Sequence, residues 1–501
     1  MKYSTVVIAR AFVLSIAVQS QICFAETLPL PKVLSEAWSR ESVSNELEYN
    51  TKTWIRDLLD GKNVDAAHNW ASVDGVLPER LASLADATYI VLAVNNELFQ
   101  ASFNRLVELL ARPTFVNSSA WKALEPELQK VYGLTLSANA ITVSKDQEAS
   151  LNKLPWGGLT GELKAFAAVR NGAASEEAIK HLSLSTPWGH HLYLSAALHQ
   201  ARTGHMELAI ATLEDGYKKS TGNKAAQNEI SLALGRLYYQ TANLKSAEEW
   251  YSKTDVQSPE GVSAAEELLW VWLRNGTTDR LRGTANSLKN SVFSTNFMPE
   301  ALVVKTISDL KLCQFDKAKS DYSDFLTTNR EWAKRIDAAQ KEDPTVAPPN
   351  ADWYAIYISR ALTERAKELV RAKALAGDSV AASVPAIGRQ KHWDTVVQDL
   401  STHVSRLERQ QASEYRRQWR NNGVMLQEAI RKMQFVKVEM ASQSEVGATA
   451  HPNSEMAVAE AAKAVKSIDK AGETGWTFPE DDGEWPDERL SMRSTGASVC
   501  L

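Results

Sequence analysis

The chain has 501 residues, of which 44% are hydrophobic and 23% charged, and its formal net charge is −5. At this length several domains or one repeat array are expected rather than a single core, and the composition is that of a chain that folds. The slightly acidic balance, without a basic domain or a base-stacking motif, argues against a nucleic-acid partner.

The N-terminus has the pattern of a secretory signal peptide. Lys2 and Arg10 supply positive charge, an apolar stretch follows at 11–18, and Cys23-Phe24-Ala25 offers a small-x-small cleavage site. The apolar stretch is shorter than the roughly 20 residues of a spanning helix, and no later segment is apolar enough to cross a membrane. We therefore expect residues 1–25 to be a signal peptide and the mature protein to be periplasmic.

Acylation of Cys23, which would make the chain a lipoprotein, is the alternative interpretation of this region. A lipidation site has small residues just before its cysteine, whereas Gln21 and Ile22 stand there. Cleavage after Ala25 is therefore the preferred interpretation, and attachment to a membrane would then depend on partners.

Residues 26–158 are predicted to form an N-terminal helical region. Apolar residues at 92–110 recur at spacings that place them on one face of a helical hairpin. Pro113 is expected to end the second helix of that pair. Many of the 15 tryptophans stand beside Leu and Ala in helical patterns, which favours their use in helix–helix contacts.

Residues 159–340 contain an internal repeat. Four turn segments align, and their last positions are 38, 34 and 37 residues apart. Each begins with a small residue that permits a tight turn, and two places later has a residue that can tuck into a helical hairpin. The four segments are 204–209, 242–247, 276–281 and 313–318. This repeat predicts a stacked array of helical hairpins.

The copy at 228–259 carries the clearest repeat pattern. The residues that fit are Leu234-Gly235, Tyr238, Ala242, Ala247, Tyr251 and Pro259, which stand where a tetratricopeptide (TPR) repeat has Leu-Gly, Tyr, turn, Ala, aromatic and Pro. Over these residues the chain resembles the TPR superfamily, while the other copies are degenerate. The resemblance implies an all-α, TPR-like helical-repeat solenoid. A generic helical bundle with chance matches is the alternative.

The resemblance also implies a protein-binding groove lined by the first helix of each hairpin. The residues that it assigns to the groove are Glu229, Leu232, Arg236, Tyr239, Gln240, Glu266, Trp270, Arg274, Ile307 and Lys311. Among them Arg236, Arg274 and Lys311 would form a cationic line beside two aromatic rings, which suits a carboxylate-rich partner. Alternatively, these residues decorate a structural surface, or the C-terminal helices fill the groove.

Two cysteines, Cys313 and Cys500, stay in the chain after signal cleavage. Two thiols in an exported protein often pair in an oxidising compartment. A disulfide between them would tie the C-terminus to the middle of the repeat region. The alternative is two free cysteines, one of them buried as a small hydrophobic residue.

A proline-containing loop at 341–350 leads to predicted C-terminal helices at 352–443. Apolar residues alternate at steps of four and three from Trp393 to Leu407, and a similar register resumes at 426–440. Asn421-Asn422-Gly423 predicts a kink or turn between these halves. The region is therefore a long-helix hairpin, which we favour, or a coiled-coil seam through which 393–440 self-associates.

The last segments differ in composition. Residues 444–475 are rich in Ala, Ser, Glu and Lys and are predicted to be a weakly structured linker. Residues 476–501 form an irregular, acidic tail with three large aromatic rings, Trp476, Phe478 and Trp485. These rings are expected to dock on the chain itself, near the arginines at 406–420, or to bind a partner.

No catalytic constellation stands out, so we expect neither an enzyme nor a cofactor. His190-His191 is the only adjacent histidine pair, and neighbouring helical residues point in different directions, so no metal site is expected there. Two functional hypotheses follow. The first is a periplasmic scaffold or adaptor that binds other envelope proteins in an assembly, secretion or motility complex. The second is a peptidoglycan-binding or glycan-binding protein that uses tryptophans as sugar platforms.

Overall fold

The computed structural model describes residues 30–377 with short gaps, 386–449, and the residue pairs 476–477 and 493–494. The gaps within the first range lie at 75, 139, 171–177, 180–188, 291–292, 294, 342–343 and 345. Apart from one two-residue strand pair, the regular elements of the described part are helices. The predicted signal peptide lies outside the described residues. None of the described helices is long and apolar enough to cross a membrane.

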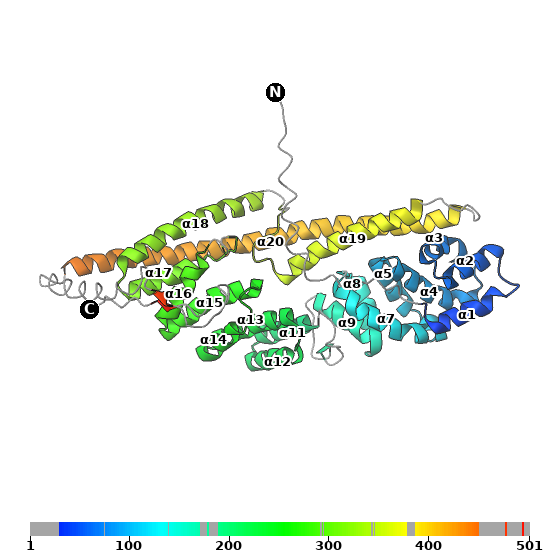
Figure 1. Ribbon diagram of the computed structural model, residues 1–501, viewed down its shortest axis with the longest axis horizontal. Helices are drawn as coiled ribbons and strands as arrows, with labels where there is room; N and C mark the ends of the chain where they lie inside the picture. The colour runs from blue at the N-terminus through cyan, green and yellow to red at the C-terminus, as the bar shows by residue number, and fades with distance from the viewer. Residues whose placement is uncertain are drawn as a thin grey trace, which may run out of the picture. The chain divides into compact units, whose positions relative to one another are not determined.

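The described helices are numbered in chain order from α1 to α20 (Figure 1). In the N-terminal part they are α1 (Lys32–Ser42), α2 (Tyr49–Leu59), α3 (Asn63–Asp74), η1 (Glu79–Leu81), α4 (Ala82–Asn95), α5 (Phe99–Leu110), α6 (Pro113–Val116), α7 (Ser119–Ala138), α8 (Lys145–Asn152) and α9 (Gly158–Arg170). The following ones are α11 (His190–Arg202), α12 (Met206–Lys219), α13 (Lys224–Gln240), α14 (Leu244–Ser252), α15 (Pro259–Asn275), α16 (Thr278–Leu288), α17 (Ala301–Lys311), α18 (Phe315–Lys341), α19 (Trp353–Gly377) and α20 (Ala386–Thr449).

The chain divides into two compact units. Unit 1 comprises residues 1–189 and 358–407, and unit 2 comprises residues 190–357 and 408–501. Each of α19 and α20 therefore contributes one part to unit 1 and another part to unit 2. The predicted segment 352–443 is accordingly divided between the two units.

The core of unit 1 is built around a row of aromatic rings. Trp38, Trp54, Trp70 and Tyr89 follow one another with centroid separations of 5.1, 5.7 and 5.3 Å. The indole N–H of Trp38 donates to Thr88 Oγ1 (2.8 Å), which satisfies a polar atom that the core encloses. Residues of α19 and α20 belong to the same buried cluster, among them Ala372, Leu375, Trp393 and Leu400.

The predicted hairpin at 92–110 is confirmed as α4 and α5. Its apolar residues are buried where the spacing placed them, including Leu92, Leu98, Phe103, Leu106 and Leu110. Helix α5 ends at Leu110, and Pro113 is the first residue of the short helix α6. Proline suits this position because it has no N–H that would be left unpaired there.

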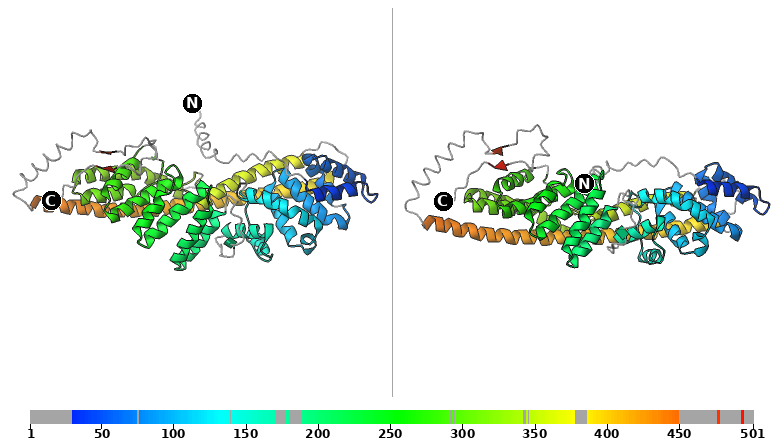
Figure 2. Two further views of the ribbon diagram at one scale, coloured as in Figure 1. Left: turned by 60° about the horizontal axis from the view of Figure 1, so that its bottom comes forward. Right: turned by 90° about the horizontal axis from the view of Figure 1, so that it is seen from below.

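Unit 2 confirms the predicted array of helical hairpins. The four pairs are α11/α12, α13/α14, α15/α16 and α17/α18, and each pair contacts the next along the chain (Figure 2). Gly204, Ala242, Gly276 and Cys313 each begin a turn, and their φ angles are +87°, +59°, +76° and +53°. This left-handed conformation closes a two-helix turn, which explains why small residues recur there.

Close approach between paired helices depends on two glycines. A Cβ atom on Gly235 of α13 would lie 2.5 Å from a ring carbon of Tyr251 on α14. One hairpin earlier, a Cβ on Gly216 would lie 2.8 Å from the ring of Tyr193. The aromatic ring fills the space that each glycine leaves, which is the packing that the Gly235 and Tyr251 repeat positions predict.

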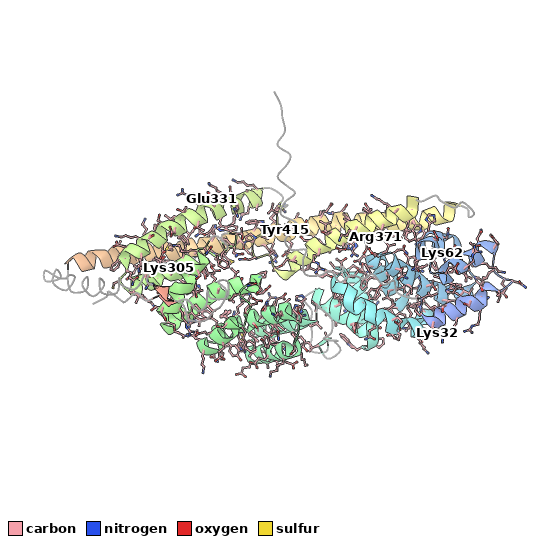
Figure 3. The ribbon with its side chains drawn as sticks, in the orientation of Figure 1. Lys32, Lys62, Lys305, Glu331, Arg371 and Tyr415 are labelled. Carbon is pink, nitrogen blue, oxygen red and sulfur yellow. The ribbon has the colours of Figure 1, made fainter. Side chains whose placement is uncertain are left out.

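A network of buried charges joins α16, α17 and α18 of unit 2. Asp309 lies 2.8 Å from Arg282 Nε and 2.8 Å from Lys305 Nζ, and its own side chain is fully buried. Lys305, which is labelled in Figure 3, also pairs with Asp321 on α18. Two cations and two carboxylates balance one another in this network, as burial of charge requires.

The predicted break at Asn421-Asn422-Gly423 is wrong, because α20 continues through it. Asn422 and Gly423 are buried, and a Cβ on Gly423 would lie 3.1 Å from Gln340 and 3.2 Å from Ile336 of α18. The glycine thus makes room for α18, which lies alongside α20 (Figure 1). Packing against a neighbouring helix outweighs the turn propensity of the tripeptide. The helix α20 begins at Ala386, ahead of the apolar pattern that starts at Trp393.

The seam of α20 in unit 2 has a heptad-like register. Its buried residues there are Tyr415, Trp419, Leu426, Ala429, Met433, Val436 and Met440. They pack against α17 and α18 in two buried clusters, so this part of the helix serves unit 2's own core. Val436 takes a buried position in this register, and its neighbour Lys437 is exposed. In unit 1 the predicted positions Trp393, Leu400 and Leu407 are buried, which confirms that half of the pattern.

Two short strands lie in the predicted C-terminal tail. Strand β1 (Trp476–Thr477) pairs antiparallel with β2 (Arg493–Ser494), and β2 contacts α16. The β2 part of the tail therefore contacts unit 2 at α16, and docking of the aromatic rings near the arginines of 406–420 stays a prediction. The rest of the tail, with Phe478 and Trp485, lies outside the described residues. So does most of the predicted linker, of which α20 takes the residues up to Thr449.

Candidate functional site

The face predicted to bind partners lies at the C-terminal ends of α13 and α15 in unit 2. Arg236, Gln240 and Arg274 are exposed there, and Tyr239 is half-buried. The Arg274 guanidinium lies over the Tyr239 ring at 5.0 Å from its centroid, so two successive hairpins contribute to one surface. A cation stacked on an aromatic ring leaves its N–H groups free to meet a carboxylate.

Arg236 has a carboxylate partner within the chain. Its guanidinium donates to both oxygens of Glu267, with a shortest distance of 2.6 Å, and Tyr251 Oη also donates to Glu267 (2.8 Å). Burial and the Glu267 charge raise the pKa of Tyr251 well above its usual range. Arg236 is thus held in place and largely neutralised, so Arg274 carries more of the cationic character of this face.

Two other positions of the predicted groove, Trp270 on the third hairpin and Ile307 on the fourth, are covered by α20. The Trp270 indole N–H donates to Glu300 Oε2 (2.7 Å), and Lys432 of α20 pairs with Glu300 and lies 4.9 Å above the Trp270 ring. Ile307 packs against a buried cluster that includes α20 residues. The alternative in which C-terminal helices fill the groove therefore describes this part.

Glu266, also assigned to the groove, instead caps a helix. Its Oε1 accepts the backbone N–H groups of Glu300 (2.9 Å) and Ala301 (3.2 Å) at the start of α17. Burial raises the pKa of Glu266 to about 8, although these two donors oppose the change. The carboxyl belongs to the junction between the third and fourth hairpins.

The three other predicted residues are dispersed. Leu232 is buried in the core between hairpins. Glu229 turns toward His190 and His191 on α11, with its Oε2 at 3.5 and 3.4 Å from their ring nitrogens. Lys311 is exposed at the end of α17.

Cys313 is disulfide-bonded. Its partner lies outside the described residues, so pairing with Cys500 stays a prediction. Strand β2 contacts α16, which precedes α17 and the turn that contains Cys313. Ser494 of β2 stands six residues before Cys500, so this point of the chain lies on the same unit as Cys313.

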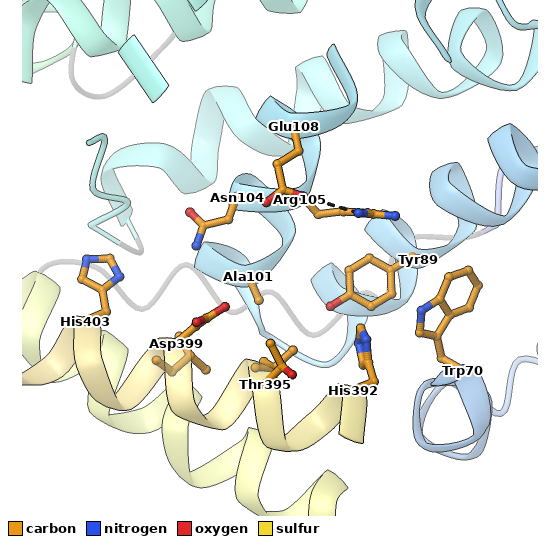
Figure 4. Close-up of a pocket in the computed structure, with 12 residues that line it drawn as sticks. Trp70, Tyr89, Ala101, Asn104, Arg105, Glu108, His392, Thr395, Asp399 and His403 are labelled. Carbon is orange, nitrogen blue, oxygen red and sulfur yellow. Dashed lines mark hydrogen bonds and ion pairs between the residues drawn. The ribbon is translucent and has the colours of Figure 1, made fainter. Parts of the chain in front are cut away.

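Unit 1 contains a polar cavity that the sequence patterns did not indicate. Its volume is about 230 Å³, and α5 and the first part of α20 supply most of its wall (Figure 4). The polar residues that line it are Asn104, Arg105, Glu108, His392, Thr395, Asp399 and His403. They come from segments nearly 300 residues apart in the chain, which explains why no local sequence motif indicates this cavity.

The polar groups of this cavity are mostly engaged with the protein. Arg105 donates to Asp86 (2.6 Å), and His403 Nε2 lies 2.7 Å from Thr142 Oγ1. Burial lowers the pKa of His392 to about 4 and that of His403 to about 3, with nearby arginines adding to both effects. Both imidazoles are therefore neutral near pH 7.

No family model, curated protein or solved structure matches the chain. The TPR assignment therefore stays a prediction from the repeat residues, although the all-α helical-repeat fold itself is shown.

Proposed function

We propose that the protein is a non-enzymatic scaffold or adaptor of the bacterial cell envelope that binds partner proteins at the exposed face of α13 and α15. The observation that carries this proposal is Arg274 stacked on Tyr239 where successive hairpins meet. Arg274 and Gln240 are exposed beside this ring, so cationic, amide and aromatic groups form one surface. The preferred partner is a carboxylate-rich peptide segment. Placement in the periplasm rests on the signal-peptide pattern.

The burial of tryptophan favours this proposal over glycan binding. Eleven tryptophan side chains are described, and eight of them are buried while the other three are half-buried. The half-buried Trp270 is covered by Lys432, and Trp250 by Lys253 at 3.5 Å from its ring centroid. A sugar platform needs an open ring face, so within the described residues these rings serve packing better than carbohydrate stacking.

The proposal is tested by capture of envelope proteins with the variant Arg274→Glu. The tagged mature protein is cross-linked in envelope fractions, and its partners are identified and quantified by mass spectrometry. We expect the wild type to recover a stoichiometric set of envelope proteins and Arg274→Glu to lose that set at least tenfold. Arg236→Glu is less suitable, because it would place a second carboxylate against Glu267.

The matched control is Lys245→Glu, which makes the same charge change on the exposed side of α14, the second helix of a hairpin. Equal loss in both variants would indicate a general charge effect, and unchanged capture by Arg274→Glu would refute the face. Recovery of peptidoglycan fragments in place of proteins would favour the glycan-binding alternative.

Self-association is a second element of the proposal. Val424, Phe435 and Val438 are 50%, 71% and 69% exposed on α20, and their spacing places them on one face of the helix. This face points away from the buried seam of the same helix. A second copy of the chain is the partner we propose for it, in keeping with the predicted role of 393–440.

A further inference from the structure

Two histidines and a carboxylate converge at the first hairpin of unit 2. His190 and His191 begin α11, and Glu229 lies on α13, which contacts α11. Adjacent residues of a helix project about 100° apart, yet the two ring centroids lie only 3.9 Å apart. The prediction that the histidines diverge is therefore not met, and both rings face the same carboxylate.

The distances suit a metal ion. Glu229 Oε2 lies 3.5 Å from His190 Nε2 and 3.4 Å from His191 Nδ1, and one ligand atom from each residue lies within 4.8 Å of the others. Ligand atoms at about 2.0–2.1 Å from a tetrahedral zinc ion are separated by about 3.3 Å. The cluster therefore needs only small side-chain movements to place three ligands around one ion.

The environment of His190 provides an independent reason. Its side chain is 6% exposed, and within the described part of the chain neither of its ring nitrogens has a hydrogen-bond partner. Buried polar atoms without a partner are rare, and a bound ion is one of the explanations for them. A proton shared between one histidine and Glu229 would explain a single His–Glu pair. It would not explain both pairs, because two charged imidazoles this close would repel each other.

We propose that His190, His191 and Glu229 bind a divalent transition-metal ion, of which zinc is the best match. Imidazole and carboxylate ligands favour zinc over calcium or magnesium, which prefer ligand sets of oxygen alone. Three protein ligands leave a fourth position for water or for a further carboxyl. Glu260 at the start of α15 is a candidate for this carboxyl, since it is close enough for the charges of Glu229 and His190 to act on it.

The proposed ion would join the first hairpin of the array to the second. Its ligands come from α11 and α13, and Glu260 would add the third hairpin. The site is independent of the proposed protein-binding face, because Arg274 and Tyr239 are not among its ligands.

The test uses the purified full chain without a histidine tag, stripped of metal with a chelator. Zinc is titrated calorimetrically, and cobalt is added separately to record its d–d absorption, which reports a tetrahedral site. We expect one equivalent of zinc to bind and the melting temperature to rise, while calcium has no effect. Glu229→Gln and His191→Gln should each weaken zinc binding at least tenfold.

The matched control is His199→Gln, which removes an exposed histidine from the same helix and should bind zinc like the wild type. Circular dichroism checks that each variant folds. The proposal is overturned if the wild type binds no stoichiometric zinc. It is equally overturned if folded Glu229→Gln and His191→Gln bind zinc as tightly as the wild type, or if His199→Gln loses as much affinity as they do.

Discussion

Asp309 provides the sharpest test of how unit 2 is held together. Its carboxylate is fully buried between Arg282 and Lys305, each 2.8 Å away, and both cations are themselves almost entirely buried. The substitution Asp309→Asn keeps the shape of the side chain but removes its charge. Two buried cations would then face one carboxylate, that of Asp321.

The expected cost follows from this imbalance. Removing one partner of a buried ion pair costs about 3–5 kcal/mol, because the other partner stays buried and uncompensated. The Arg282 Nε–Asp309 contact is close but not aligned as a hydrogen bond. We therefore expect the lower end of that range, a loss of about 3 kcal/mol in the free energy of unfolding.

The assay is urea unfolding, combined with hydrogen exchange to localise the effect. The urea midpoint should fall with an unchanged slope, and amides of α16, α17 and α18 should lose protection first. The control is Asp337→Asn, because Asp337 pairs with Lys341 at the surface of α18 at 2.6 Å and both side chains are more than 60% exposed. That pair is expected to contribute less than about 1 kcal/mol.

A second variant separates charge balance from local packing. Lys305→Met combined with Asp309→Asn removes one charge of each sign, so the network is neutral again. The double variant should be more stable than Asp309→Asn alone. A loss no larger than that of Asp337→Asn, or a double variant less stable than the single one, would refute the reasoning.

Four further predictions follow from the described contacts. Gly235→Ala should destabilise unit 2 by about 1–3 kcal/mol in urea unfolding, because its Cβ would lie 2.5 Å from Tyr251; a neutral result would mean that the ring moves freely. Phe435→Ser with Val438→Ser should weaken self-association in sedimentation equilibrium without lowering the melting temperature, and an unchanged association constant would exclude that face. The pKa of Glu266 is raised to about 8, so the wild type should lose about 3 kcal/mol of stability relative to Glu266→Gln as pH rises from 5 to 8. A pH-independent difference would contradict this. The pKa of His403 is lowered to about 3, so only the unfolded state takes up a proton there as pH falls from 7 to 5.5. The wild type should therefore lose about 1 kcal/mol of stability relative to His403→Gln over this range. A gain in relative stability would contradict this.

Local signals in the sequence were sufficient for the repeat array. Gly204, Ala242, Gly276 and Cys313 stand where the chain adopts positive φ, a conformation that side chains with large Cβ substituents rarely take. Because this requirement is local, it recurs at a near-constant interval and can be seen without knowing the fold. The Gly235–Tyr251 contact could be predicted from the sequence for the same reason, since both residues lie within one hairpin.

Features that depend on distant segments were not accessible in this way. Asn421-Asn422-Gly423 has the composition of a turn, and only the presence of α18 near Gly423 explains why it is helical. The unit 1 cavity joins α5 to α20, and no spacing rule relates residues so far apart. Glu266 was placed in a groove because the repeat frame says nothing about the N-terminus of α17 that it caps.

The histidine pair shows how a local rule can mislead about chemistry. Projection angles apply to positions inside a helix, whereas His190 is the first residue of α11 and its side chain can follow Glu229 on another helix. The same residue, Glu229, was predicted to serve a binding groove, and its carboxylate is committed to the histidines. The exposed face of α13 is therefore shorter than the repeat frame implies, and it begins at Arg236. If zinc binds where we propose, the ion fixes α11 against the N-terminal half of α13, while the C-terminal end of α13 presents Tyr239 beside Arg274 of α15. Metal binding would then rigidify the helix that supplies the binding face without contacting the partner.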